Sequence, residues 1–291
     1  MKKAIVINDL SGFGKCSLTA AIPVLSVLGI QCVPLATAVL TGQTGYPYYH
    51  CTDLTDMMPL YIDAWEKNHT SFDAIYSGFL TGNEQVRHVM SLIDVFSRRD
   101  TFVLIDPVMG DNGHVYGLFT KELQEGMKKL VRKADMITPN LTEACLLLDE
   151  NPQQLLSIEK TQDLISLAKD LANRLLNNGD KPKEIVITGI KSTDPHTLEV
   201  YNLAVSEKGS SLTKSPYIGR SFSGTGDLFS SCMCGLRMNG YALPEAISIT
   251  EQFLLASIRD SMEENTPSND GIHFEKNLHL LIQKGVHYDQ S

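Results

Sequence analysis

Basic side chains and long apolar runs are both scarce in this sequence. It holds 25 Lys and Arg against 34 Asp and Glu, a formal net charge of −9. Nucleic acids and anionic membranes attract proteins through a basic face, so this balance argues against both as main partners. No apolar run approaches the roughly 18 residues of a membrane-spanning helix, and the run at residues 4–7 is far shorter than the core of a signal peptide. We therefore expect a cytoplasmic protein.

The cysteines lack the spacing of a metal or redox motif. Cys232 and Cys234 are separated by one residue, whereas a zinc knuckle or a redox pair needs two. The other thiols are scattered through apolar surroundings. We expect buried free thiols at all six positions, Cys16, Cys32, Cys51, Cys145, Cys232 and Cys234.

Two familiar nucleotide-binding motifs are also missing. Gly14 and Lys15 look like the end of a P-loop, but Asp9 stands where its first glycine belongs. A Rossmann turn needs a third glycine where this chain has Ser17. The sequence therefore predicts neither a Walker-type ATPase nor a Rossmann dehydrogenase.

What the chain does contain is a regular alternation of β-branched runs and amphipathic stretches. Expected strands lie at residues 3–9, 30–40, 72–79, 101–105, 134–137 and 184–189, with an antiparallel edge within 197–214. Expected helices lie at residues 15–28, 53–67, 85–96, 120–133, 157–176, 243–262 and 274–284. This alternation requires a mostly parallel sheet covered by helices on both faces, and we expect one α/β domain over residues 1–291.

Residues 223–227, Ser-Gly-Thr-Gly-Asp, precede an apolar run with helical spacing. Free N–H groups converge at the start of a helix, and the helix dipole adds partial positive charge there, so the loop is suited to a phosphate. A carboxylate at Asp227 would repel a phosphate, but it could take a proton from a hydroxyl. We interpret Asp227 as a base beside a phosphate cradle; the alternative is an acid that merely stabilises the first helical turn.

Other polar residues follow the expected strands. Asp106 and Asp111 flank a proline that ends a strand and would suit Mg²⁺, although Asp106 could simply cap a turn. Residues 140–143 also fit a capping box, and Ser11 could cap the first helix. Carboxyl ends of parallel strands share one edge, so one rim should collect Ser11, Thr44, Phe79, Asp106, Asp111, Glu143, Thr188 and residues 224–227. Such a set describes a phosphoryl-transfer site.

These motifs resemble those of a known superfamily. Gly224-Thr225-Gly226-Asp227 before a helix resembles the signature of the ribokinase-like small-molecule kinases, and residues 140–143 look like their Asn-x-x-Glu magnesium motif. Residues 106–111 with 138–140 look like the vitamin B6 branch. The resemblance covers nearly the whole chain. It implies a three-layer α/β/α sandwich that uses ATP to phosphorylate the 5′-hydroxymethyl group of pyridoxal, pyridoxamine and pyridoxine.

The resemblance also implies roles for single residues. Asp227 would be the base, and the N–H groups of Gly224, Thr225 and Gly226 would stabilise the transferred phosphoryl group. The remaining implied roles are Mg²⁺ binding by Asp111 and Glu143 with support from Asn140, nucleotide binding by Thr188 and Gly189, and substrate binding by Ser11, Thr44 and Phe79. Phe79 stands where the family carries a tyrosine that stacks on the pyridine ring.

Some features leave alternatives open. The Ser-Gly-x-Gly run at residues 11–14 leans toward hydroxymethylpyrimidine kinases of thiamine synthesis, but that branch typically has Cys after Gly-Thr-Gly, where this chain has Asp227. A catalytically silent binding protein of the same fold is the other alternative, and an intact Asp227 argues against it. The segment at residues 111–116 is short for a phosphate-covering flap. The resemblance further implies a homodimer and, in some members, a monovalent cation such as K⁺.

Overall fold

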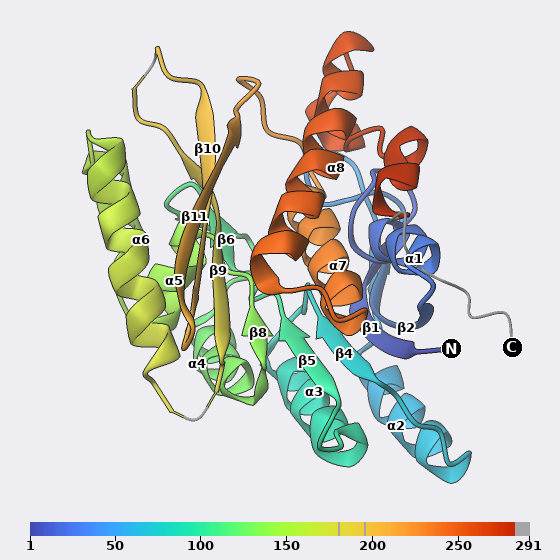
Figure 1. The fold of residues 1–291 in the computed structure, drawn as a ribbon. Coiled ribbons are helices and arrows are strands. Elements are labelled where there is room, and N and C mark those ends of the chain that lie inside the picture. Colours follow the sequence, from blue (N-terminus) through green and yellow to red (C-terminus); the bar gives the residue numbers. More distant parts are fainter. Residues whose placement is uncertain (180, 195, 283–291) are drawn as a thin grey trace, which may run out of the picture.

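A mixed sheet of nine strands runs through the protein. The structure is a computed structural model that describes residues 1–179, 181–194 and 196–282. The strand order is β11-β10-β9-β8-β5-β4-β1-β2-β3 (Figure 1). The strands are β1 (Lys3–Ser11), β2 (Gln31–Leu40), β3 (Cys51–Asp53), β4 (Ala74–Ser77), β5 (Phe102–Ile105), β8 (Met136–Ile137), β9 (Glu184–Lys191), β10 (Glu199–Ser206) and β11 (Gly209–Pro216).

The centre of this sheet, from β2 to β9, is parallel, and its edges are antiparallel. The edge expected within residues 197–214 is therefore confirmed as the β10–β11 hairpin. β1 has buried side chains on both sides: Ile5 and Ile7 belong to one hydrophobic cluster, and Ala4 and Val6 to the other. A strand covered on both faces needs an unbroken apolar run, which explains its sequence.

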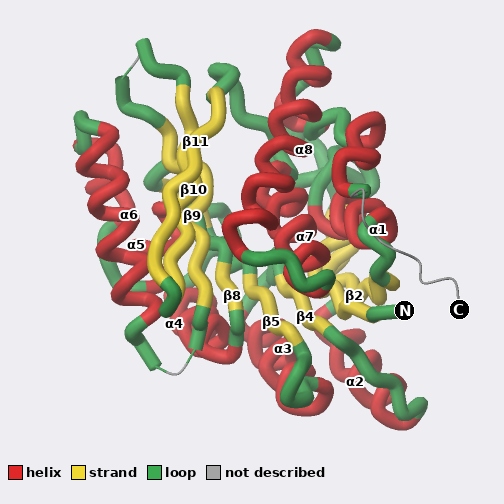
Figure 2. The backbone as a smooth tube through the Cα atoms, in the orientation of Figure 1, coloured by secondary structure: helices red, strands yellow, loops and turns green. Residues whose placement is uncertain are grey.

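Helices cover both faces of the sheet, and Figure 2 shows the three layers. One face carries α1 (Ser17–Val27), α7 (Thr225–Met238) and α8 (Leu243–Glu263). The opposite face carries α2 (Met58–Lys67), α3 (Asn83–Phe96), α4 (Lys121–Leu130), α5 (Leu141–Leu147) and α6 (Thr161–Leu176). The predicted three-layer α/β/α sandwich is thus confirmed. In the described ranges, no helix has the length and apolar content needed to cross a membrane.

The short elements differ most from expectation. The helix expected at 274–284 is a 3₁₀ helix over Glu275–Leu281, and residues 283 and 284 lie outside the described residues. β3 and the small hairpin of β6 (Gly110–Asp111) and β7 (His114–Val115) were not predicted, because two or three residues carry no readable periodicity. All six thiols are free, but Cys51 is exposed on edge strand β3 and Cys32 is only half-buried, so the expectation of burial was wrong for these two.

Candidate active site

The glycine-rich loop does open a helix, as predicted. Gly224 is the N-cap of α7, with a φ of 79° in the left-handed region. A Cβ atom at Gly224 would overlap the carbonyl oxygen of Lys15, so both the backbone angle and the close approach require glycine here. The next N–H groups, of Thr225 and Gly226, belong to the first turn of α7 and have no acceptor within the helix. The loop therefore presents the positive end of the helix dipole, as an anion cradle does.

Asp227 follows this cradle and is held from two sides. Asn8 on β1 donates a hydrogen bond from Nδ2 to Oδ1 of Asp227, with 3.0 Å between the two atoms. The backbone N–H of Ser17, the first residue of α1, lies near the same carboxylate and favours its ionised form. Burial raises the pKa of Asp227 to about 6, and the charge of Asp9 adds to this, while the two donors oppose it. A carboxylate with this pKa is ionised at neutral pH yet more basic than an ordinary aspartate.

Asp106 is a buried acid beside the half-buried Asp227. It is 6% exposed and accepts a hydrogen bond from Oγ of Ser230 at 3.1 Å. Burial, followed by the charge of Asp227, raises the pKa of Asp106 to about 8. From the sequence, Asp106 was expected on this rim, where it would either help to bind Mg²⁺ or cap a turn. In the structure its carboxyl group also lies within electrostatic range of Asp227.

Glu143 forms the capping box that the sequence also allowed. Its Oε2 accepts the N–H of Asn140 at 2.9 Å, and Oδ1 of Asn140 accepts the N–H of Glu143 at 3.0 Å. Oε1 of Glu143 accepts a second N–H, from Met109, at 3.1 Å. The capping interpretation is therefore confirmed, and the side chain of Asn140 also holds the carbonyl of Gly110 at 2.8 Å.

The two residues expected to hold Mg²⁺ lie close enough to influence each other. Burial raises the pKa of Glu143, and the charges of Asp106 and Asp111 raise it further. In the part of the chain that the structure describes, no cluster of three His, Cys, Asp or Glu side chains is arranged to hold a metal. Magnesium commonly binds one or two carboxylates together with phosphate oxygens. A repelling pair such as Asp111 and Glu143 fits that mode of binding, in which the nucleotide supplies the remaining ligands.

A cavity of about 200 Å³ lies next to the cradle. Its walls include Thr188 and Gly189 of β9 together with Thr225 and Gly226 of α7. Gly189 has a φ of 67°, and its N–H is held by Oδ1 of Asn202 at 3.0 Å. The structure thus brings the residues expected at the nucleotide site together with two residues of the phosphate cradle.

The three expected substrate residues have different surroundings. The side chain of Ser11 is fully buried and donates to Oδ2 of Asp9 at 2.7 Å. Cys16, not Ser11, is the N-cap of α1, so the capping alternative for Ser11 was wrong. Phe79 is half-buried just after β4, and its N–H is held by Oδ1 of Asn8 at 2.9 Å.

Thr44 is exposed in the loop between β2 and β3. Gln43, the residue before Thr44, anchors that loop. Its Nε2 donates to Oγ of Ser223 at 3.3 Å and to the carbonyl of Asn269 at 3.1 Å. The loop therefore contacts the residue before the glycine cradle, which places it on the expected rim.

Sequence reasoning missed Asn8, which holds Asp227, and Asp9, whose charge raises the pKa of Asp227. Both lie on β1, which runs on to Ser11, two residues beyond the predicted end. The available signal was an Asn-Asp pair directly continuing a β-branched run, because polar residues inside a buried strand need partners. These partners are far away in the sequence, and only the fold identifies them.

Comparisons with known proteins show the family of this chain. The profile of the phosphomethylpyrimidine kinase family matches residues 18–270. A pyridoxine/pyridoxal/pyridoxamine kinase of Bordetella avium is 26% identical over 279 residues, which cover 89% of this chain and 86% of that protein. A bifunctional thiamine biosynthetic enzyme of Arabidopsis thaliana is 28% identical over 255 residues, 84% of this chain and 44% of that protein.

Similar proteins of solved structure are also named as kinases of this kind. A crystal structure of a "putative phosphomethylpyrimidine kinase" of Bacteroides thetaiotaomicron with pyridoxal is 37% identical, has a TM-score of 0.87, and matches over 97% of this chain and 96% of that one. A pyridoxal kinase of Lactobacillus plantarum, at 24% identity, shares the fold, with a TM-score of 0.83 and 97% of both chains covered. The predicted kinship with vitamin B6 kinases is confirmed, and the chain belongs to the phosphomethylpyrimidine kinase family.

Proposed function

We propose that this protein transfers the γ-phosphoryl group of ATP to the 5′-hydroxymethyl group of pyridoxal, pyridoxamine and pyridoxine. The observation that carries the proposal is the Asp227 carboxylate, with a pKa of about 6, placed directly after an N-terminal cradle that opens on a cavity. The similar proteins named as B6-vitamer kinases, and the relative solved with pyridoxal, support the choice of substrate.

In this reaction Asp227 acts as the general base. It takes the proton of the substrate hydroxyl while the hydroxyl oxygen forms a bond to the γ-phosphorus, and the bond from that phosphorus to the bridging oxygen of ADP breaks. The N–H groups of Gly224, Thr225 and Gly226 donate to the oxygens of the transferred group, where negative charge is redistributed in the transition state. A base that is ionised at neutral pH needs no further activation.

ATP would occupy the cavity beside the cradle. Thr188 and Gly189 line it on the strand side, with Asn140 paired to Thr188 through a backbone bridge. Phe229 and Leu254 add apolar surface that suits a nucleobase, while Thr225 and Gly226 lie where the cavity meets the cradle. This arrangement directs the triphosphate toward Asp227.

Magnesium would be held by Asp111 and Glu143. A bound Mg²⁺ would neutralise charge on the triphosphate, and the mutual repulsion of these two carboxylates favours the binding of a cation. Asp111 lies on the short β6–β7 hairpin, where its carboxylate accepts the backbone N–H of Asn112 at 2.7 Å and the Asn112 side-chain amide at 2.8 Å. These hydrogen bonds fix the orientation of the carboxylate. A K⁺ requirement stays a prediction, tested by activity in K⁺ against Na⁺.

The pyridine ring would stack on Phe79, with Ser11 and Thr44 at its polar edge. A phenylalanine keeps the offset stacking that the family's tyrosine provides and lacks only the hydroxyl. Asn8 supports this assignment, since it holds both the backbone of Phe79 and the carboxylate of Asp227. The ring site and the base are therefore next to each other.

The test is a parallel assay of ATP- and Mg²⁺-dependent phosphorylation of pyridoxal, pyridoxamine, pyridoxine and hydroxymethylpyrimidine, with Asp227→Asn as the blank. We expect turnover of the pyridines that disappears in the blank. The pyrimidine is included because the matching family is named for phosphomethylpyrimidine kinase and the Arabidopsis relative is a thiamine biosynthetic enzyme. Turnover of the pyrimidine alone would replace the proposal by that second activity, and no turnover of any alcohol would indicate a binding protein.

Three further expectations belong to this proposal. Residues 1–291 form a single kinase domain, supported by two hydrophobic clusters that share one sheet. The protein is a homodimer, which light scattering would test. It is cytoplasmic, which fractionation of the source cells would test.

A further inference from the structure

Ser17 begins α1 with a backbone conformation that serine seldom adopts. Its φ is 52°, and the residue is only 4% exposed. A left-handed φ is unfavourable for a residue with a side chain, and it persists only where the surroundings hold it. The preceding N-cap, Cys16, makes no side-chain hydrogen bond to the helix. The start of α1 is therefore held by something other than an ordinary cap.

Asp9 provides the contact that holds Ser17. The Oγ of Ser17 donates to Oδ1 of Asp9 at 2.5 Å, and Oγ of Ser11 donates to Oδ2 at 2.7 Å. Asp9 is 5% exposed, so this carboxyl group is removed from solvent and depends on the two hydroxyls. One of the two donors is the residue whose backbone N–H reaches Asp227.

We propose that Asp9 is a positioning residue of the phosphoryl transfer, which holds Ser17 by its hydroxyl so that the Ser17 N–H stays directed at the carboxylate of Asp227. The inference rests on the proposed function, because it assigns Asp227 the role of base. Asp9 itself does not touch the substrate. It acts through Ser17 and fixes the second of the two donors that orient the base.

The charges around Asp227 make that donor important. Asp9 on β1 and Asp106 after β5 are acids. The Cys16 thiol and the hydroxyls of Tyr76 on β4 and Tyr116 after β7 also lie within electrostatic range. None of these five groups is a cation. The ionised form of Asp227 is instead stabilised by the hydrogen bond from Asn8 and by the Ser17 N–H nearby. Loss of the Ser17 N–H should therefore raise the pKa of the base and disturb its orientation.

The test compares two variants that remove the same hydroxyl. Ser17→Ala removes the contact to Asp9 and leaves a side chain that disfavours the φ of 52°, so the N–H should move away from Asp227. We expect kcat to fall about tenfold, with the KM for ATP unchanged and the acid limb of the kcat/KM profile moved to higher pH. Ser17→Gly also loses the hydroxyl, but glycine adopts this φ without a tether. We expect its kcat to stay within about threefold of the wild type.

A double-variant cycle connects the effect to Asp9. Asp9→Asn should lower kcat in the wild-type background and have much less effect on kcat in the Ser17→Gly background, because there the N–H no longer depends on the tether. Equal losses of kcat in both backgrounds would show that Asp9 does not act through Ser17.

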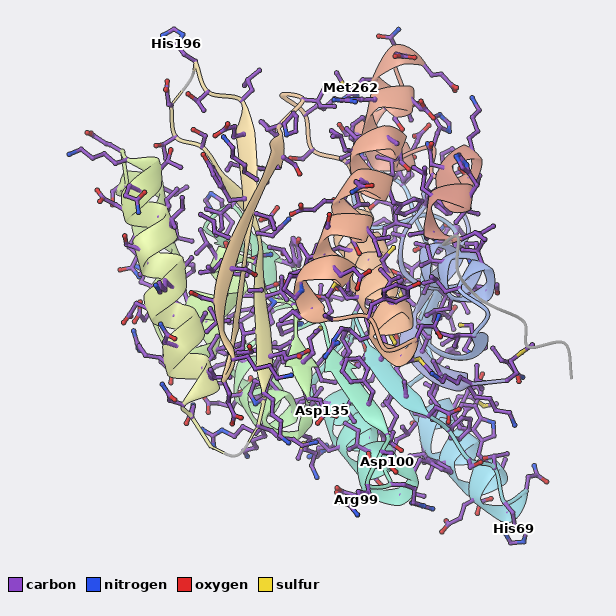
Figure 3. The ribbon with its side chains drawn as sticks, in the orientation of Figure 1. His69, Arg99, Asp100, Asp135, His196 and Met262 are labelled. Carbon is purple, nitrogen blue, oxygen red and sulfur yellow. The ribbon has the colours of Figure 1, made fainter. Side chains whose placement is uncertain are left out.

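His69 provides the matched control. It has a φ of 53°, is exposed, and extends from the far end of α2 in Figure 3. His69→Ala and His69→Gly should leave kcat and the pH profile unchanged, which separates a general benefit of glycine from an effect at the base. If the wild type phosphorylates a B6 vitamer and Ser17→Ala matches it in kcat and pH profile, the inference fails alone. If the wild type phosphorylates no alcohol, the proposed function fails first.

Discussion

Replacing Asp227 by Asn should make the protein more stable while it removes most of the activity. The pKa of Asp227 in the folded protein is about 6, against an ordinary value of 3.8. At neutral pH the folded state therefore carries an ionised carboxylate, although burial favours its protonated form. That difference in pKa corresponds to at most about 3 kcal/mol. Because Asp227 is partly exposed, solvent screening reduces the figure, and we expect a gain of about 1–2 kcal/mol at pH 7.5.

The size of the effect changes with pH in a defined window. Below pH 3.8 the group is protonated in both the folded and the unfolded chain, so its ionisation costs nothing. Between pH 3.8 and about 6 the wild type loses stability as pH rises, and above pH 6 the loss is complete. Asp227→Asn does not titrate, so its advantage over the wild type should grow across this window. Asn can still accept the hydrogen bond from Asn8, which keeps the local packing.

Urea unfolding of both proteins at pH 4.5 and pH 7.5, with kcat measured on the same preparations, tests this expectation. We expect the stability difference to be larger at pH 7.5 and kcat to fall by about 10²–10⁴. Asp100→Asn, at the exposed turn before β5 (Figure 3), is the control and should change neither quantity. An Asp227→Asn protein less stable than the wild type at pH 7.5 would refute the claim that burial of this charge costs folding free energy.

Three other substitutions have separable outcomes. Phe79→Ala should raise the KM for the vitamer about tenfold by removing the stacking surface and leave the KM for ATP nearly unchanged, and equal changes in both would remove the stacking assignment. Asp111→Ala should shift the Mg²⁺ titration of activity to higher concentration, whereas an unchanged titration would count against a metal role. Gly224→Ala should lower the stability by more than 1 kcal/mol, because a Cβ atom there overlaps the carbonyl of Lys15 and φ is 79°; thermal unfolding at the wild-type temperature would contradict this.

The layered fold could be predicted because its signals are local. The apolar run at residues 4–7 and the helical spacing in residues 85–96 each indicate their own element, as do the turn and apolar stretch that begin α7. The site was predictable to the extent that it uses the ends of those elements, as with Gly224 and Asp227. The short β3 strand and the β6–β7 hairpin were missed because two or three residues are too few to show the alternation of apolar and polar side chains that marks a strand.

The support around the base could not be predicted for a different reason. Asn8 and Asp227 are separated by 219 positions, and no local pattern indicates their hydrogen bond. The pair at residues 8 and 9 appeared to be the polar end of a strand, while the folded chain buries both side chains beneath the site. Glu143 shows the opposite case: its capping role is a local pattern, and the sequence predicted it correctly beside the metal role that remains proposed.

The single amide group of Asn8 has a consequence for substrate size. Its Oδ1 holds the backbone of Phe79, and its Nδ2 holds the carboxylate of Asp227, so the surface proposed to carry the ring and the base that takes the proton are spaced by one rigid planar group. A hydroxymethyl arm places its oxygen one carbon away from the ring. An alcohol on a longer arm would carry its oxygen past Asp227, however well its ring fitted. The length of the substrate's arm is therefore selected by Asn8 on β1, and not by the residues that contact the ring itself.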